Sequence, residues 1–320
     1  MKRSGQAQRP AAIEKELVES MRIALATCSN LPDWEVDDRP LHAALETRGA
    51  EVLRPAWDDA AFDWAACRAV LIRTTWDYQE RREAFLAWAA RVSGLTLLFN
   101  PLDTVRWNTH KSYLRDLASK GVPTAPTVWL DAGDSVDLRA VLRERGWTRA
   151  FVKPAIGSTA RETLRFAADD AGIAAATQHL ERLLAREDML LQPYLEGVET
   201  EGELSVIRID GEFTHAVRKV PVAGDYRVQD DFGASDMAIE LDDELVAVAH
   251  AAFAAVDTDT DLLYGRVDLL RDAEGHLNVT ELELVEPSLF FRHEPRAAER
   301  LAAGLLRRVA SLGRTRSPAS

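Results

Sequence analysis

Short apolar runs alternate with segments of helical spacing along the first part of the chain. Runs typical of buried strands lie at residues 22–28, 51–54, 69–73 and 95–99. Between them, apolar residues recur with the period of a helix at 38–48 and at 80–92, which predicts amphipathic helices. This alternation favours a parallel sheet covered by helices. Ligands of such sheets bind beyond the carboxyl ends of the strands, so the loops at 29–34 and 73–78 are candidates for a substrate pocket.

After residue 100 the pattern changes to helices mixed with longer alternating strands. Further strands are predicted at 125–130, 151–153, 163–167, 189–192, 203–209 and 212–220. Further helices are predicted at 109–120, 135–145, 169–186, 243–255 and 295–312. Asp210-Gly211 joins two of these strands and is a strong signal for a hairpin. Pro193 lacks a backbone donor, so we expect its strand to lie outside the middle of a regular sheet.

A second hairpin carries most of the charged positions that bear on function. It consists of two alternating strands and a turn, at 262–270, 276–284 and 272–275. The period of two places Arg266 and Asp268 on one face of the first strand, and it places Glu281 and Glu283 together on the second. Crowded carboxylates repel one another, which raises their pKa unless a hard divalent cation neutralises them. The alternative is an acidic face exposed to water.

A lysine and the small-residue loop after it have the chemistry of a phosphate site. Lys153 falls within an apolar strand, where an ammonium group needs an anion. The loop that follows contains Gly157, Ser158 and Thr159, whose backbone N–H and hydroxyl groups could cover phosphates. The stretch is not a P-loop, because its lysine precedes the loop. The alternative is a tight turn, and Lys111, on a predicted helix, is by itself compatible with a solvated lysine.

The strand that ends near residue 195 suits the recognition of an adenosine. Its last residues can offer backbone N–H and C=O groups to an adenine ring, at Gln192, Pro193, Tyr194 and Leu195. Acidic residues follow, and one of them could hold a ribose: Glu199, Glu201 or Glu203. Cations come next, at Arg218, Lys219 and Arg227.

Composition narrows the class of protein. The chain has 320 residues, of which 47% are hydrophobic and 28% charged, enough for two or three subdomains. A net charge of −13 without a long basic stripe argues against nucleic acid as a partner. Cys28 and Cys67 lack the spacing of metal ligands and fit a reducing cytoplasm. The longest apolar run, 246–256, is too short to span a membrane, and residues 1–20 are expected to be a disordered tail rather than a secretory signal.

In chain order, the features are a lysine, a lysine before a small-residue loop, a hinge strand, a basic strand end and an Asp…Glu-x-Glu hairpin. This order resembles the ATP-grasp superfamily over residues 106–293. The resemblance implies a fold that combines α/β and α+β parts. It implies four regions: a disordered tail at 1–20, a pre-ATP-grasp parallel-sheet domain at 21–105, a small phosphate-lid subdomain with a linker helix at 106–190, and a C-terminal subdomain at 191–320.

The resemblance also implies roles for the residues that would bind ATP. Lys111 and Lys153 resemble the two lysines that contact its phosphates, and the loop after Lys153 resembles the flexible loop that closes over them. The four residues from Gln192 resemble the adenine hinge. Glu199 fits the ribose acid of D-alanine–D-alanine ligases and Glu203 fits that of glutathione synthetases, and we favour Glu203.

On the second hairpin, Asp268, Glu281 and Glu283 resemble the ligands of Mg²⁺, for which Mn²⁺ could substitute. Many members have Asn at the position of Glu283, and a glutamate should hold the ion at least as well. The group that would stabilise the transferring phosphoryl consists of Lys153, Arg227 and Arg266. Candidates for binding a small amino-acid-like carboxylate are Arg73, Asp77 and Arg292. Neither nucleic acid nor a membrane is an expected partner, and a homodimer stays open.

Four runs resemble a narrower group within the superfamily, the O-ureido-serine cyclo-ligase of cycloserine biosynthesis and its relatives. They lie at residues 73–78, 215–219, 224–229 and 281–290. The implied reaction is an ATP-dependent ligation of a carboxylate and an amine through an acyl phosphate, which closes a ring when the attacking nitrogen is in the same molecule. A peptide or glutathione-synthetase-like ligase that joins two molecules is one alternative. A nucleotide-binding sensor without chemistry is another.

Overall fold

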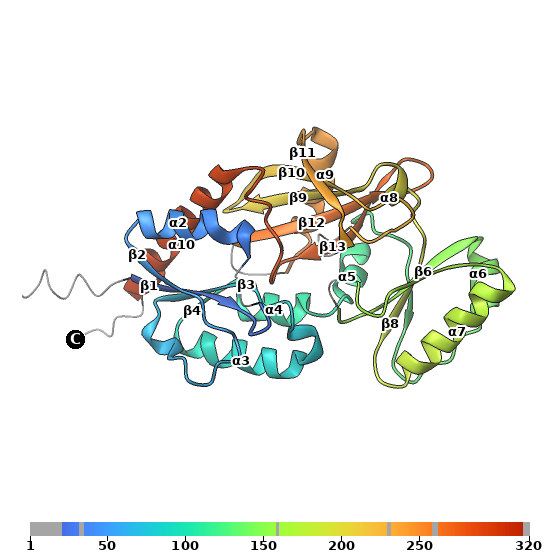
Figure 1. Cartoon of the computed structure of the whole chain (residues 1–320), viewed down its shortest axis with the longest axis horizontal. Coiled ribbons are helices and arrows are strands. Elements are labelled where there is room, and N and C mark those ends of the chain that lie inside the picture. Colours follow the sequence, from blue (N-terminus) through green and yellow to red (C-terminus); the bar gives the residue numbers. More distant parts are fainter. Residues whose placement is uncertain (1–20, 32–34, 158–159, 229–231, 258–261, 316–320) are drawn as a thin grey trace, which may run out of the picture.

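The computed structural model describes residues 21–31, 35–157, 160–228, 232–257 and 262–315, and three sheets follow one another along this chain (Figure 1). The first sheet is parallel and has the order β2-β1-β3-β4. Its strands and helices are β1 (Met21–Thr27), α2 (Arg39–Thr47), β2 (Ala50–Leu53), β3 (Ala69–Thr74), α3 (Arg82–Leu95) and β4 (Leu97–Phe99). Short 3-10 helices lie at Val36–Asp38, Trp64–Ala66 and Tyr78–Glu80. The parallel sheet predicted from the alternating pattern is confirmed.

Alternate residues of β1 supply the cores on the two faces of this sheet. Ile23 and Leu25 belong to a buried cluster that includes residues of α2, whereas Ala24 and Ala26 belong to another that includes Phe85 of α3. The connections from β1 to β2 and from β3 to β4 run in opposite directions along the sheet. The two clusters place α2 and α3 on opposite faces of the sheet, as the general preference for right-handed crossovers predicts for connections in opposite directions.

The second sheet is antiparallel and has the order β5-β8-β6-β7. Its elements are β5 (Val128–Leu130), α6 (Leu138–Arg145), β6 (Arg149–Pro154), β7 (Leu164–Ala167), α7 (Asp170–Leu184) and β8 (Met189–Pro193). Because β8 lies between β5 and β6, the expectation that its strand avoids the middle of the sheet is wrong. Pro193 is tolerated because it is the last residue of β8, and the pairing of β8 with β5 already ends at Leu191.

The third sheet is antiparallel and has the order β11-β10-β9-β12-β13. Its elements are β9 (Glu203–Ile209), β10 (Glu212–Val220), β11 (Ser235–Ile239), α9 (Asp243–Ala254), β12 (Tyr264–Arg271) and β13 (Leu277–Glu283). Both predicted hairpins are confirmed, whereas the edge strand β11 is not among the predicted strands. Asp210 and Gly211 have φ angles of 50° and 87°, the positive values that a tight two-residue turn requires and that glycine adopts without strain.

The region between the first two sheets differs from its prediction. The sequence predicts one helix at 109–120 that carries Lys111, but two shorter helices are present, α4 (Leu102–Asn108) and α5 (Tyr113–Ser119). Lys111 lies in the turn between them, where its backbone N–H donates to the carbonyl of Ala155 at 2.8 Å. This bond fixes the turn against the second sheet and interrupts the helix. A one-turn helix, α8 (Gly197–Thr200), follows that sheet.

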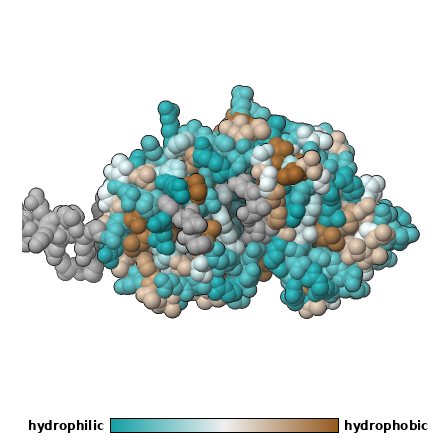
Figure 2. Space-filling view, in the orientation of Figure 1, coloured by the Kyte–Doolittle hydropathy of each residue, from teal (hydrophilic) through white to brown (hydrophobic). Residues whose placement is uncertain are grey.

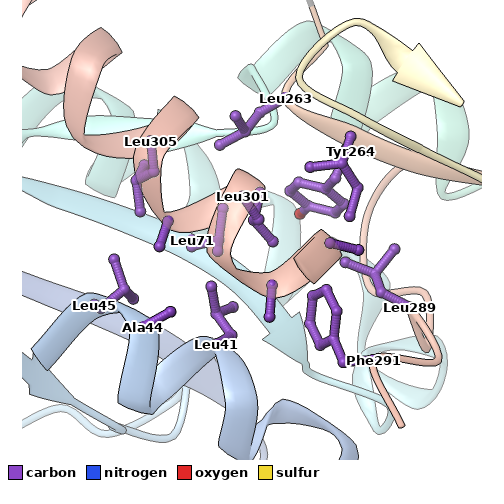
Figure 3. Close-up of a cluster of buried hydrophobic side chains, with 14 of the residues drawn as sticks. Leu41, Ala44, Leu45, Leu71, Leu263, Tyr264, Leu289, Phe291, Leu301 and Leu305 are labelled. Atoms are coloured by element: carbon purple, nitrogen blue, oxygen red, sulfur yellow. The ribbon is translucent and has the colours of Figure 1, made fainter. Parts of the chain in front are cut away.

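The last helix, α10 (Pro295–Thr315), returns to the first sheet (Figure 3). Leu301 and Leu305 of α10 lie in one buried cluster with Leu41 and Leu45 of α2 and with Leu71 of β3. Its sequence position groups this helix with the C-terminal region, yet its apolar face completes the core of the N-terminal sheet.

Buried polar groups join the first sheet to the third. Asn100 Nδ2 donates to the carbonyls of Tyr264 and Leu284 at 2.9 and 2.7 Å. The N–H of Leu263 donates to Asn100 Oδ1 at 3.0 Å. One amide side chain thus satisfies three buried backbone groups at the start of β12 and the end of β13, which fixes the second hairpin to the N-terminal sheet.

The face of the molecule drawn in Figure 2 is mostly hydrophilic, with small hydrophobic areas scattered over it. The large hydrophobic side chains that are exposed come from separate elements: Val36, Leu95, Val222, Met237 and Leu312. Over the described ranges, no helix combines the length and the apolar character that crossing a membrane requires.

Leu301→Ala is expected to lower the free energy of unfolding by about 2–5 kcal/mol, because it opens a cavity in the core shared by α10 and the first sheet. Urea unfolding followed by circular dichroism measures the change. Leu95→Ala is the matched control, since Leu95 is 49% exposed and its truncation should change the value by less than about 0.5 kcal/mol. Equal effects of the two substitutions would contradict the packing described for α10.

Candidate active site

A cleft with a volume of about 320 Å³ is lined by strands of the second and third sheets and by segments outside the strands, among them the segment after β3. It gathers most of the predicted site residues: Lys111, Lys153, Gly157, Gln192, Pro193, Tyr194, Leu195, Glu203, Arg227, Arg266, Asp268, Glu281 and Glu283. Ser158 and Thr159, predicted to cover the phosphates, lie outside the described residues. Within the described part of the chain, four predicted residues do not line this cleft: Arg73, Asp77, Glu199 and Arg292.

The register of the hairpin formed by β12 and β13 turns its charges toward the cleft. Arg266 pairs with Glu283 and Asp268 pairs with Glu281, and a bulge follows Asp268. Residues directly opposite in an antiparallel pair point to the same face. The four charges therefore share the face that lines the cleft, whereas Val267 between them packs in the apolar core on the other side.

Glu281 is held between two lysines from different parts of the chain. Lys111 Nζ and Lys153 Nζ donate to the same oxygen, Oε1, at 2.9 and 3.3 Å. Burial alone would raise the pKa of Glu281, but the two ammonium groups outweigh it and hold the pKa at about 2. Burial lowers the pKa of Lys153, and Glu281 opposes this shift. The two lysines predicted to contact phosphates thus meet at one carboxylate.

Asp268 is enclosed by donors and is only 2% exposed. Arg266 donates to both of its oxygens, each at 2.9 Å. Ser205 Oγ donates at 2.5 Å, and Lys219 Nζ lies 3.4 Å away while it also pairs with Glu203. Burial would raise the pKa of Asp268, but these cations hold it well below its usual range. Asp268 is therefore charged, and Arg266 and Lys219 compensate its charge.

The three carboxylates Asp268, Glu281 and Glu283 have the oxygen donors that Mg²⁺ prefers. Among the residues that the structure describes, however, no group of three or more acidic, His or Cys side chains is poised around a metal position. Glu283 pairs with Arg266, as Asp268 does. Burial raises the pKa of Glu283 to about 7, with Arg266 opposing the rise and the charges of Asp268 and Glu281 adding to it. The site fits a hard cation in chemistry, and the carboxylates would exchange their protein partners for it.

Tyr194, predicted to belong to the adenine hinge, lies close to two arginines. The guanidinium carbons of Arg149 and Arg165 lie 4.3 and 5.2 Å from the centre of its ring. Its hydroxyl donates to Glu199 at 2.6 Å, and both arginines also donate to Glu199. Glu199 is thus bonded to three neighbours and does not line the cleft, whereas Glu203 does. This placement favours Glu203 over Glu199 as the residue that would bind a ribose.

Arg73 lies inside the protein rather than at the cleft. Its guanidinium donates to both carboxylate oxygens of Asp38, at 2.7 to 3.2 Å, and to the carbonyl of Pro287 at 3.2 Å. Arg73 is 1% exposed and Asp38 is fully buried. The structure therefore does not bring Arg73 to a substrate carboxylate, because a buried partner that no sequence pattern reveals already neutralises its charge.

Asp77 and Arg292 are also held by protein neighbours. Asp77 accepts a hydrogen bond from Trp57 Nε1 at 2.7 Å and pairs with Arg81 at 2.8 Å. Arg292 pairs with Asp236 of the edge strand β11. These ion pairs hold both predicted substrate residues away from the lining of the cleft.

Several residues that line the cleft have no individual role in the prediction, although Trp76 and Tyr78 belong to the loop 73–78 that was expected to form a substrate pocket: Glu35, Trp76, Tyr78, Asn108, Glu286 and Ser288. Four of them lie in the runs 73–78 and 281–290, which marked the narrower resemblance without a role for each residue. Asn108 Nδ2 donates to the carbonyl of Leu282 at 2.8 Å, and the N–H of Leu284 donates to Asn108 Oδ1 at 2.7 Å. Its side chain thus makes the hydrogen bonds that a neighbouring strand would make to the edge of β13. No periodic pattern marks such a residue.

Family models match two parts of the chain. Residues 23–100 match the N-terminal domain of the D-cycloserine synthetase DcsG, and residues 124–285 match the ATP-grasp domain of prokaryotic glutathione synthetase. The cycloserine biosynthesis protein DcsG of Streptomyces lavendulae is 36% identical over 299 residues, which cover 90% of this chain and 98% of that relative.

Solved structures show the same relationship. The crystal structure of D-cycloserine synthetase DcsG aligns with a TM-score of 0.82 at 35% identity, covering 90% of this chain and 99% of that one. A D-alanine–D-alanine ligase from Bacillus anthracis complexed with ATP aligns with a TM-score of 0.66 at 15% identity, covering 93% and 100% of the two chains. The second likeness concerns the fold alone. The predicted ATP-grasp fold with an N-terminal parallel sheet is confirmed.

Asp38→Ala is expected to lower the free energy of unfolding by about 3–5 kcal/mol, because it leaves the Arg73 guanidinium buried without its partner. Adding Arg73→Met to Asp38→Ala should recover part of that loss, which a double-mutant cycle measured by urea unfolding detects. Asp103→Ala removes an exposed ion pair with Arg106 and should cost less than about 1 kcal/mol. A similar small loss for Asp38→Ala would contradict the structural role given to Arg73.

Proposed function

The chain belongs to the family of the cycloserine biosynthesis protein DcsG and is an ATP-grasp ligase, and we propose that it activates the carboxylate of an amino-acid-like substrate with ATP and then closes a ring within that molecule. The observation that carries the proposal is the convergence of Lys111, Lys153 and the hairpin carboxylates on one cleft, in a chain 36% identical to DcsG. The proposed substrate is an O-ureido-serine-like amino acid, and the proposed product is a cycloserine-like ring.

The proposed reaction has two steps. A carboxylate oxygen of the substrate forms a bond to the γ-phosphorus of ATP while the bond from that phosphorus to ADP breaks. The ureido nitrogen that is bonded to oxygen then attacks the acyl carbon, inorganic phosphate leaves, and the nitrogen gives up its proton. The carbamoyl group stays on the ring nitrogen at this point, and its removal consumes water. Neither step requires a covalent bond to the enzyme.

Positioning and charge neutralisation supply most of the rate enhancement of an enzymatic phosphoryl transfer, and the cleft contains groups for both. Lys111 and Lys153 would neutralise the phosphates of ATP, and Arg227 and Arg266 would stabilise the transferring group. The residues that would hold Mg²⁺ are Asp268, Glu281 and Glu283. When bound, this ion supplies further neutralisation of the phosphate charge.

A ligase that joins two separate molecules is the second candidate. It is favoured by the match of residues 124–285 to the ATP-grasp domain of glutathione synthetase. Both candidates form the same acyl phosphate with the same residues. They differ in whether the nucleophilic nitrogen belongs to the activated molecule or to a second one.

Release of ADP, measured with Mg²⁺, ATP and a panel of acids, tests the proposal. The panel contains O-ureido-D-serine, D-serine, L-serine, D-alanine and pairs of amino acids. We expect turnover with O-ureido-D-serine alone and a cyclic product by mass spectrometry. Turnover only with pairs of molecules would replace cyclisation by intermolecular ligation, and the absence of turnover with every acid would contradict both.

Glu281→Gln is expected to lower kcat in this assay by at least about 100-fold, because it removes the carboxylate on which Lys111 and Lys153 converge. Glu274→Gln is the matched control, since Glu274 is exposed in the turn of the same hairpin. Its kcat should equal that of the wild type. An active Glu281→Gln enzyme would remove the hairpin carboxylates from the proposed mechanism.

Glu203→Gln is expected to raise the KM for ATP by about 10-fold, which corresponds to about 1.4 kcal/mol of lost binding. Glu199→Gln should leave the KM for ATP within about 3-fold of the wild type, since Glu199 is held outside the cleft by its arginine neighbours. Steady-state kinetics at varied ATP concentration compare the two. The opposite ranking would assign the ribose to Glu199.

A further inference from the structure

Glu286 lines the cleft without an ion pair to any residue in the described part of the chain. The cleft carboxylates on the third sheet each have a cation within 4 Å: Glu203, Asp268, Glu281 and Glu283. Glu35, on the opposite wall, accepts a hydrogen bond from the N–H of Asp37 and caps a turn. Lys111 and Arg266 act on Glu286 through their charge at longer range, and both are bonded to other carboxylates.

Two aromatic residues of the segment after β3 line the cleft together with Glu286. Trp76 Nε1 donates to the backbone carbonyl of Glu286 at 3.1 Å, and the phenol of Tyr78 opposes the rise in the pKa of its carboxyl group. Tyr78 is 6% exposed and stacks on Phe85, with ring centres 4.8 Å apart. Burial raises the pKa of Glu286 to about 8, and the charge of Glu283 adds to the rise. A carboxylate held in this way gains from a cation that arrives with a ligand.

We propose that Glu286 binds the ammonium group of the substrate and selects amino acids over carboxylic acids that lack an amine, an inference that rests on the function proposed above. An amino acid brings a carboxylate for activation and, on the neighbouring carbon, an ammonium group. Bonded to Glu286, this nitrogen stays protonated and has no lone pair with which to attack an acyl phosphate. The ureido nitrogen is then the reactive one.

The surroundings of Glu286 favour an ammonium group over a second metal ion. The neighbouring groups on this wall of the cleft are the indole of Trp76 and the phenol of Tyr78, whose faces attract organic cations. Mg²⁺ instead prefers several carboxylates and retained waters. The metal candidates Asp268, Glu281 and Glu283 lie on the hairpin, whereas Glu286 follows it along the chain.

The test compares O-ureido-D-serine with its des-amino analogue, in which hydrogen replaces the ammonium group. For the wild type, kcat/KM should favour the amino acid by on the order of 100-fold, because the analogue leaves the carboxylate without a cation. Glu286→Gln should reduce this preference to about 5-fold or less, mainly through the KM of the amino acid. Tyr78→Phe should reduce it partially, and Glu274→Gln should leave it unchanged.

Measurements of substrate binding and of the Mg²⁺ requirement distinguish the possible outcomes of this test. Calorimetric titration of O-ureido-D-serine in the presence of a non-hydrolysable ATP analogue should show at least about 10-fold weaker binding to Glu286→Gln, which holds whether or not ring closure occurs. Glu286→Gln could instead lower kcat/KM equally for O-ureido-D-serine and its des-amino analogue and raise the Mg²⁺ concentration needed for activity. That result would make Glu286 a metal ligand and overturn the inference. An unchanged preference in a Glu286→Gln protein with wild-type thermal unfolding would overturn it as well. If the wild type binds O-ureido-D-serine but releases no ADP with it, the proposed cyclisation fails while the role of Glu286 stands.

Discussion

Asp268 is almost completely removed from water, and it keeps its charge because Arg266, Lys219 and Ser205 surround it. The two lysines around Glu281 act in the same way. A charge at such depth is costly unless each partner is in place. The partners come from β6, β9, β10, β12 and the turn between α4 and α5. The charges of the cleft are therefore compensated only when the second sheet is packed correctly against the third.

This arrangement also explains how a chain with a net charge of −13 can serve an anionic nucleotide. The chain contains 39 Lys and Arg residues, and six of them line the cleft where the second and third sheets face each other. Because the wall of a cleft has a low dielectric constant, charges placed there act more strongly than charges on an open surface. The opposite wall instead contains aromatic groups that follow β3, Trp76 and Tyr78, together with the acidic residues Glu35 and Glu286. The two walls thus differ in the kind of ligand that each can hold.

The sequence predicted the parts of the structure that follow from local periodicity. The period of two in the second hairpin was sufficient to place Arg266, Asp268, Glu281 and Glu283 on one face, and the alternation of strands and helices predicted the first sheet. Arg73 could not be interpreted in this way, because its partner Asp38 is distant in sequence and carries no signal of pairing.

The other differences between the prediction and the structure also arise from contacts between residues distant in sequence. The helix predicted around Lys111 is interrupted by a backbone bond to the second sheet, and the place of β8 inside its sheet depends on where β5 ends. The role of Asn108 beside β13 depends on a contact between elements far apart in the chain. Each of these features is decided by tertiary contacts, which override local preference.

The packing of α10 has a consequence for the order in which the chain is made. A ribosome delivers the N-terminal sheet first, and segments generally begin to fold as they emerge. Leu301 and Leu305, which complete the core over Leu41, Leu45 and Leu71, emerge after the other two sheets. The part of this apolar face that α10 covers, beside α2, therefore stays exposed through most of translation. During that interval, the exposed apolar surface favours aggregation of the nascent chain.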